Sequence, residues 1–87
     1  MDRTHEARTA GGGIVSKAEE DPAGTITIYT DVASPHSAAQ ETSRYEAIIA
    51  CEAVRASMGA TTVLVLDASE DPFVIYNGSN FPECAVR

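Results

Sequence analysis

A single helix-forming stretch in the middle of the chain constrains the fold more than any other feature. The segment ASPHSAAQETSRYEAIIACEAVRASMGA, residues 33–60, is rich in alanine and has helix-terminating signals at both ends. Ser34 is a good N-cap, and Pro35 fits the first helical position, where its missing N–H is no loss. Gly59 supplies the left-handed residue that commonly ends a helix. Ser37 with Gln40 offers an alternative capping box one turn later. The pattern predicts a helix over residues 35–58.

Strand-forming segments flank this helix on both sides. TITIYTDV, residues 25–32, alternates isoleucine with polar or aromatic residues, as a strand with one buried face does. TTVLVLDAS, residues 61–69, and DPFVIYNGS, residues 71–79, are β-branched runs bounded by turn residues. GGGIVSKAEED, residues 11–21, adds a short strand. The order predicts an α+β fold, one long helix packed on a mainly antiparallel four-stranded sheet in the order β-β-α-β-β.

Length limits the chain to one domain, because 87 residues leave no room for two cores. The beginning, MDRTHEARTAGG, is polar or small and has no period. We therefore expect residues 1–12 to form a flexible leader and residues 13–87 to form a single small α+β domain. A domain of this size buries only about 60% of its unfolded surface and usually needs a further source of stability.

The helix and the strands carry more apolar surface than one helix and one sheet can bury. The first helical stripe, expected to pack on the sheet, consists of Tyr45, Ile49, Ala53 and Ala56. A second stripe consists of Ala47, Cys51, Val54 and Met58. We expect a homodimer with residues 63–66 or the second stripe in the contact. Alternatively, the N-terminal segment and the tail NFPECAVR fold over this surface.

Charge excludes one class of partner. Thirteen acidic residues face six Lys and Arg, which gives a net charge of −7. Binding to nucleic acid needs a basic surface that neutralises phosphates, so direct binding to DNA or RNA is not expected. A host protein or nucleoprotein complex with a basic surface is the expected partner. On the helix, Glu41 is expected to pair with Arg44, and Glu52 with Arg55.

The tripeptide Glu-Asp-Pro occurs at residues 20–22 and 70–72, each time before an apolar run that ends in Ile-Tyr. Asp can fold back on its own backbone and Pro fixes φ, so both copies are expected to start strands. A crossover helix places these turns at opposite ends of the sheet. Their acids are also suited to a basic groove, and the candidate partner-binding residues are Glu19, Glu20, Asp21, Asp67, Glu70 and Asp71.

Neither a signal peptide nor a run long enough to span a membrane is recognisable, so a cytoplasmic protein without membrane contact is expected. Cys51 and Cys84 are then expected to be a reduced pair. His5 and His36 have no zinc-finger spacing with these cysteines, and Gly11 to Gly13 lack the residues of a phosphate loop. We expect no catalytic residue, no metal and no cofactor.

One segment pair resembles the ribonuclease H family. TIYTDVAS, residues 27–34, is similar to that family's first strand, whose metal-binding Asp corresponds to Asp31. SRYEAIIACEAVRASMGATTVLVLDAS, residues 43–69, is similar to its first helix and next strand, with Asp67 near another metal-binding Asp. The resemblance implies a Mg²⁺-dependent nuclease that uses these two residues. Arg44 stands where the family has a catalytic Glu, so the activity implied is degenerate.

A second resemblance is to small phage anti-CRISPR proteins that block type I surveillance complexes. It covers residues 24–80 by size and element order, and AVRASMGATTVLVL, residues 53–66, is the closest stretch. It implies a non-enzymatic acidic inhibitor that occupies a basic, nucleic-acid-binding surface of a host complex in the host cytoplasm. This is the leading functional hypothesis. The alternatives are the ribonuclease H-like enzyme and a homodimeric adaptor domain.

Overall fold

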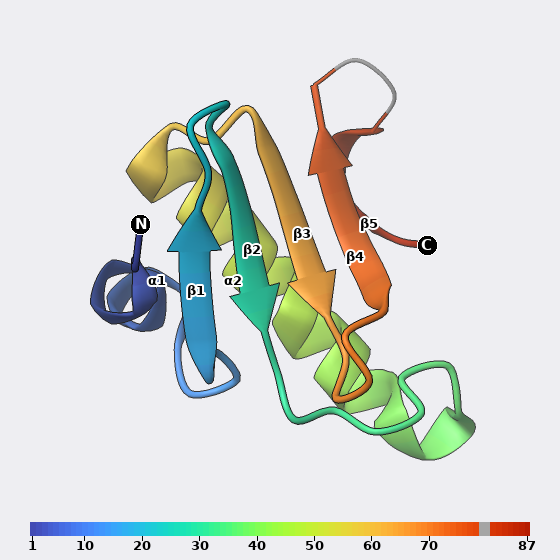
Figure 1. The fold of residues 1–87 in the computed structure, drawn as a ribbon. Helices are drawn as coiled ribbons and strands as arrows, with labels where there is room; N and C mark the ends of the chain where they lie inside the picture. The colour runs from blue at the N-terminus through green and yellow to red at the C-terminus, as the bar shows by residue number, and fades with distance from the viewer. Residues whose placement is uncertain (79–80) are drawn as a thin grey trace.

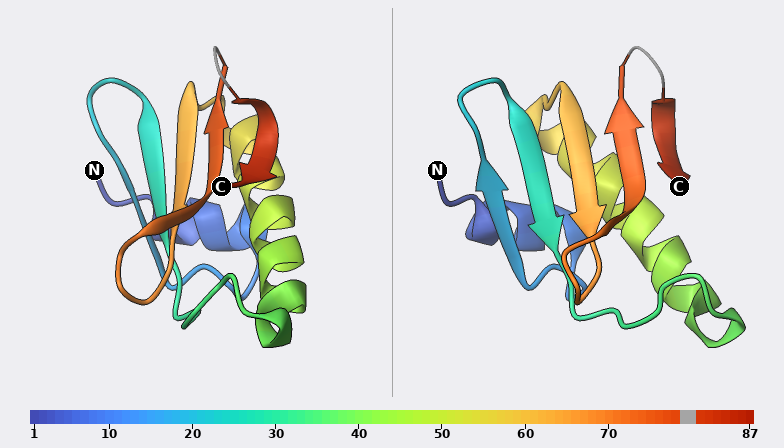
Figure 2. Two further views of the ribbon diagram at one scale, coloured as in Figure 1. Left: turned by 90° about the vertical axis from the view of Figure 1, so that its right-hand side faces the viewer. Right: turned by 45° about the vertical axis from the view of Figure 1, so that its right-hand side comes forward.

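The computed structural model describes residues 1–78 and 81–87, and in these residues five strands form one mixed sheet (Figure 1). The strands cross the sheet in chain order: β1 Lys17–Glu20, β2 Thr25–Tyr29, β3 Thr62–Leu66, β4 Pro72–Asn77 and β5 Phe81–Val86. β2 and β3 run parallel, and the other neighbours run antiparallel. The helices α1 Thr4–Gly11 and α2 Glu41–Met58 lie on the same side of this sheet, as Figure 2 shows.

The α+β class predicted from the sequence is confirmed, but the details differ. The sheet has five strands rather than four, because the C-terminal tail pairs with β4 as β5. The sheet is mixed because α2 is a crossover that returns the chain to the starting end, which makes β3 parallel to β2. The structure also has a second helix, α1, in addition to the predicted long helix.

Residues 1–12, expected to be a flexible leader, instead fold onto the sheet and α2. The N–H of Arg3 donates to the carbonyl of Ala18 (2.9 Å), and the N–H of Glu20 donates to the carbonyl of Met1 (2.8 Å). The first residues therefore run along the outer edge of β1 before α1 begins. Backbone pairing of this kind leaves no hydrophobic period in the sequence, which is why the pattern gave no sign of it.

α1 packs against α2 through small residues. Ala7 is fully buried, and a Cβ added at Gly11 would lie 3.0 Å from the Cβ of Ala50 on α2. Any larger residue than glycine would therefore push the two helices apart. The contact brings α1 to the same side of the sheet as α2, over β1 (Figure 2).

α2 covers β3, β4 and β5 with its second stripe. Its buried residues are Ala47, Ala50, Cys51 and Val54. The same core contains fully buried residues of the three central strands: Ile26, Ile28, Val63, Val65 and Val74. The first stripe faces solvent instead, and Tyr45 and Ile49 keep 64% and 49% of their surface exposed. The expectation that this stripe packs on the sheet was wrong. Both stripes are apolar, but the second stripe lacks the tyrosine and therefore permits a closer approach of the helix to the sheet.

The end of α2 was predicted correctly, and its beginning was not. Gly59 adopts a left-handed conformation (φ 63°) and its N–H donates to the carbonyl of Arg55, as expected. The α-helix starts at Glu41 rather than at residue 35, after the 3₁₀ turn Ala38–Gln40. Ser34 has a φ of 50°, which no N-cap adopts.

The contacts of Arg44 explain why the first predicted turns of the helix do not form. Its Nη1 donates to the carbonyls of Pro35 (2.6 Å) and Ser37 (2.7 Å), so it fixes the preceding loop in a non-helical path. The predicted pair of Glu41 with Arg44 does not form. The pair of Glu52 with Arg55 does form, at 2.9 Å.

A disulfide joins Cys51 on α2 to Cys84 on β5, so the expectation of a reduced pair was wrong. Neighbouring contacts support the same junction. Glu52 Oε1 accepts a hydrogen bond from the N–H of Cys84 (2.8 Å), and the guanidinium of Arg55 lies 4.4 Å from the ring centre of Tyr76 on β4. The pairing could not be foreseen because it depends on β5, which the sequence pattern did not indicate.

We predict that replacing both cysteines by alanine lowers the free energy of unfolding by about 3.5–4 kcal/mol, because the bridge closes a loop with a sequence separation of 33. Urea denaturation of the oxidised protein and the double variant measures this difference. A reductant should destabilise the native protein to a similar degree and leave the double variant unchanged. Equal midpoints for all samples would contradict the prediction.

Candidate functional site

The two acidic turns lie at opposite ends of the sheet, as expected, because one precedes β2 and the other follows the parallel strand β3 (Figure 1). In the first turn, Asp21 Oδ1 accepts hydrogen bonds from the N–H groups of Ala23 (2.9 Å) and Thr25 (3.0 Å). The N–H of Gly24 donates to the carbonyl of Asp21 (3.1 Å). Gly24 has a φ of 90°, which completes a type I turn with a left-handed last residue.

The second turn repeats this geometry from Asp67. Its Oδ1 accepts from the N–H groups of Ser69 (2.9 Å) and Asp71 (3.0 Å), and its carbonyl accepts from the N–H of Glu70 (2.9 Å). Glu70 takes the left-handed position, with a φ of 64°. The structural counterpart of Asp21 is therefore Asp67, whereas Asp71 closes its turn.

The Glu-Asp-Pro repeat is thus not a repeated structural unit. In the first copy Pro22 lies inside the turn, and in the second copy Pro72 is the first residue of β4. Both copies precede a strand, as predicted, but only in the second copy is the proline itself the first residue of the strand. What the two turns share is an aspartate whose Oδ1 accepts a hydrogen bond from the N–H group four residues later.

The carboxylates beside the first turn are paired within the chain. Glu19 lies 2.9 Å from Lys17, and Glu20 lies 2.9 Å from Arg3. The hydrogen bond from Lys17 and its charge lower the pKa of Glu19, and the same pair raises the pKa of Lys17. Three of the predicted partner-binding residues, Glu19, Glu20 and Asp21, are therefore engaged in contacts of the fold itself.

The carboxylates beside the second turn are not paired. Within residues 1–78 and 81–87, Glu70 and Asp71 take part in no ion pair or side-chain hydrogen bond through their carboxylates. The same is true of Asp31, just after β2, and Glu41, at the start of α2. We refer to Asp31, Glu41, Glu70 and Asp71 as the acidic end.

Backbone contacts hold the acidic end together. The buried hydroxyl of Thr30 donates to the carbonyl of Leu66 (2.8 Å). The N–H of Ala68 donates to the carbonyl of Val32 (2.8 Å), so the chain after β2 follows the chain after β3. The N-terminal part of α2 lies at this same end of the sheet (Figure 1). Four exposed carboxylates from three segments thereby share one end of the molecule.

Few cations balance this charge, because most are used in internal contacts. Arg3 and Lys17 pair with the carboxylates of β1, and Arg55 pairs with Glu52. Arg8 donates to the carbonyls of Val15 (3.0 Å) and Ser16 (2.6 Å). At the acidic end, Arg44 is bound to two loop carbonyls, and His36 is exposed. Arg87 is also close to this end, since its N–H donates to the carbonyl of Phe73 at the start of β4 (3.0 Å).

The residues implied by the ribonuclease H resemblance do not fit a two-metal centre. Asp31 and Asp67 do follow adjacent parallel strands. However, Asp67 Oδ1 is occupied by two backbone N–H groups, and Arg44 is directed to backbone carbonyls. The described part of the chain contains no group of three or more His, Cys, Asp or Glu arranged to hold a metal ion. Two-metal hydrolysis needs such a cluster.

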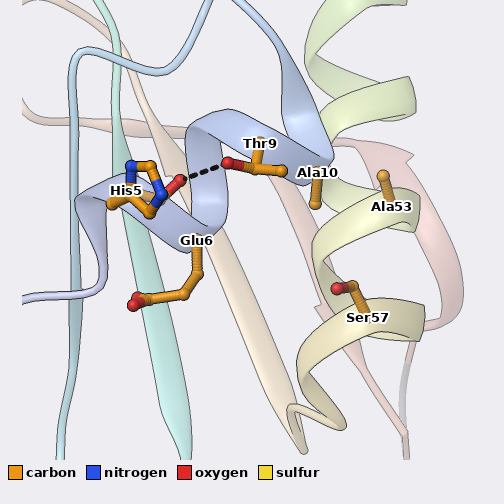
Figure 3. A pocket seen from close by; sticks show the side chains of 6 residues that line it. All are labelled: His5, Glu6, Thr9, Ala10, Ala53 and Ser57. Atoms are coloured by element: carbon orange, nitrogen blue, oxygen red, sulfur yellow. Dashed lines mark hydrogen bonds between the residues drawn. The ribbon is translucent and has the colours of Figure 1, made fainter.

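A second surface feature, missed from the sequence, lies on the outer face of α2. Tyr45 and Ile49 protrude there as exposed large apolar residues. Further along the helix, a hollow of about 550 Å³ lies between α1 and α2 (Figure 3). Its lining consists of His5, Glu6, Thr9, Ala10, Ala53 and Ser57. The sequence does contain an indication of this surface, namely the first apolar stripe of the helix, which was expected to pack on the sheet.

The contacts predicted for a homodimer are buried in part. Val63, Val65, Cys51 and Val54 are fully buried in the core of the same chain. Leu64 and Met58, which belong to the same predicted contacts, keep part of their surface exposed. Part of the alternative holds, since α1 and β5 both pack into this one fold.

Comparison with known proteins places the chain in no family: no family model, no curated protein and no solved structure matches it. Neither helix in the described residues has the length and apolar character needed to cross a membrane.

We predict that Glu70→Gly raises the free energy of unfolding by about 1 kcal/mol, because glycine tolerates the left-handed conformation that glutamate adopts there (φ 64°). Urea denaturation provides the measurement. The matched control is Gly24→Ala, which should destabilise because its φ is 90° and the added Cβ would lie 3.2 Å from Thr61 Oγ1. Equal or lower stability of Glu70→Gly would refute the assignment of the turn.

Proposed function

We propose that this chain is a non-enzymatic binding protein whose acidic end engages a basic surface of a protein or nucleoprotein partner. The observation that supports the proposal is the unequal use of charge within the fold. The carboxylates at the first turn are paired with Lys17 and Arg3, whereas Asp31, Glu41, Glu70 and Asp71 have no partner in the described residues. Unpaired surface charge of one sign accelerates association with an oppositely charged partner and selects against others.

The resemblance to small phage anti-CRISPR proteins gives this proposal a specific form. The partner would be a type I surveillance complex, and the acidic end would occupy the basic groove that otherwise holds nucleic acid. Such an inhibitor needs no cofactor and no catalytic residue, because exclusion of the nucleic acid is sufficient. Of the six partner-binding residues predicted from the sequence, Glu70 and Asp71 remain candidates. Asp31 and Glu41 join them as partner-binding residues of the acidic end.

We predict that Glu70→Gln with Asp71→Asn weakens partner binding about three- to tenfold at low salt and reduces its salt dependence, because the removed attraction is electrostatic. The partner is first isolated from the source cell by affinity capture, and its affinity is then measured over a salt series. The matched control, Glu19→Gln with Glu20→Gln, removes the same charge from the opposite end and should leave affinity nearly unchanged.

An equal loss in both variants would show that net charge alone matters, and no loss in either would contradict the proposed surface. The inhibitor form has its own measurement. The captured complex should bind its nucleic acid more weakly when the chain is added, and unchanged binding would exclude a shared groove.

The ribonuclease H-like alternative leads to a separate prediction. With Mg²⁺ or Mn²⁺, the purified protein should not cleave an RNA–DNA hybrid, because Asp67 is committed to the turn and Arg44 to the loop. A gel assay with labelled hybrid measures this. Cleavage that disappears in Asp31→Asn would establish the enzyme and overturn the prediction.

A further inference from the structure

We infer that the disulfide between Cys51 and Cys84 is a redox switch that controls whether β5 stays on the sheet. β5 is the last strand in the sheet order, so it has a strand neighbour, β4, on one side only. It also contacts α2, beside which it lies in Figure 2. The bridge joins the strand to the middle of this helix. The oxidised protein holds β5 in place, and the reduced protein lets it open.

Burial of side chains contributes little to the attachment of the end of β5. Within residues 83–87, Cys84 is the one buried side chain, and the other four residues are half-buried or exposed. Val86, the large apolar residue among them, keeps 38% of its surface exposed. Burial of apolar surface is the dominant favourable term in packing. This segment therefore has little besides the bridge to hold it against α2.

The hydrogen bonds of β5 are also a weak attachment. The register between β4 and β5 shifts between Ile75 and Asn77, so the ladder is interrupted. Towards α2, the N–H of Cys84 donates to Oε1 of Glu52 (2.8 Å), in a contact that is only partly buried. Strands with few buried apolar contacts and exposed hydrogen bonds open locally more often than core strands. In the reduced protein, the interrupted ladder and this one contact remain.

The oxidised bridge prevents this opening, because it keeps the Cα atoms of Cys51 and Cys84 6.1 Å apart. A dithiol reductant removes the constraint in two steps of thiol–disulfide exchange. One thiolate of the reductant attacks the sulfur of Cys84, which is the less buried cysteine, and Cys51 leaves as a thiolate. The second thiol, once deprotonated, attacks the mixed disulfide, so Cys84 also leaves as a thiolate. The reductant becomes a disulfide, and its two electrons pass to the protein sulfurs.

Opening of β5 uncovers the edge of β4 and the thiol of Cys51. β2 and β3 do not pair with β5, so their part of the core stays in place. Disulfides persist in oxidising compartments and are reduced where thiol reductants are abundant. The state of β5 would therefore follow the redox environment of the protein. None of the four residues of the acidic end belongs to this junction, so the inference does not rest on the proposed function.

Hydrogen exchange of the backbone amides, measured by mass spectrometry of peptic fragments, tests the switch. The oxidised protein is compared with the same protein in dithiothreitol. A global loss of stability speeds exchange in all strands together, so the informative quantity is the exchange rate of residues 81–87 relative to β2 and β3. We expect this ratio to rise at least about tenfold on reduction, because local opening adds to global unfolding. Circular dichroism verifies that the reduced protein is folded.

Two variants serve as controls. Cys51→Ala with Cys84→Ala should show the high ratio with and without dithiothreitol. Glu52→Ala removes the remaining acceptor on α2, so it should raise the ratio about tenfold further in the reduced protein and hardly at all in the oxidised one. An unchanged ratio on reduction overturns the inference, and so does a reduced protein that unfolds as a whole. An equal effect of Glu52→Ala in both redox states would also overturn it, because the hydrogen bond and not the bridge would then hold the strand.

Discussion

The small side chains on the inner face of α2 determine how the rest of the molecule is arranged. Ala47 and Ala50 are buried on the face of α2 that lies on β3, β4 and β5, and Ala50 also admits α1 through its contact with Gly11. Close packing of this kind brings many atom pairs to contact distance, and each pair adds a small dispersion attraction. Once this face is inside, Tyr45 and Ile49 have no place in the core. The exposed row of α2 is therefore a consequence of how the core is filled.

The use of cations inside the fold has a comparable effect on the surface. Arginine and lysine side chains hold β1, the loop before α2 and the junction with β4 and β5. A guanidinium that donates to backbone carbonyls is fixed in place and is poorly placed to screen carboxylates elsewhere. The negative charge that remains is thus unevenly distributed, although the sequence spreads its acids along the whole chain. The surface on which an acidic protein attracts a basic partner is therefore determined by where its unpaired carboxylates lie in the fold, rather than by its composition.

The sequence predicted those elements whose signal is local. Gly59 marked the end of α2, and alternation marked β2, because both depend on neighbouring residues alone. The choice between two apolar helical stripes could not be made locally, since it depends on which side chains allow the sheet to approach. The disulfide could not be predicted locally, because it joins Cys51 on α2 to Cys84 on β5 across a sequence separation of 33. At the acidic end, Glu70 and Asp71 were recognised from residue type, whereas Glu41 was expected to pair with Arg44, which binds loop carbonyls instead.

The path of the first residues along β1 bears on assembly of another kind. A sheet whose two edge strands both have unpaired backbone groups can pair with another chain at each edge. Such pairing can continue indefinitely and produce a fibre. Here the bridge between Asp2 and Glu19, with the backbone bonds of Arg3 and Glu20, occupies the edge of β1. Backbone pairing between copies is then restricted to the β5 side, where two chains meeting edge to edge leave nothing for a third. The arrangement favours closed complexes over fibres.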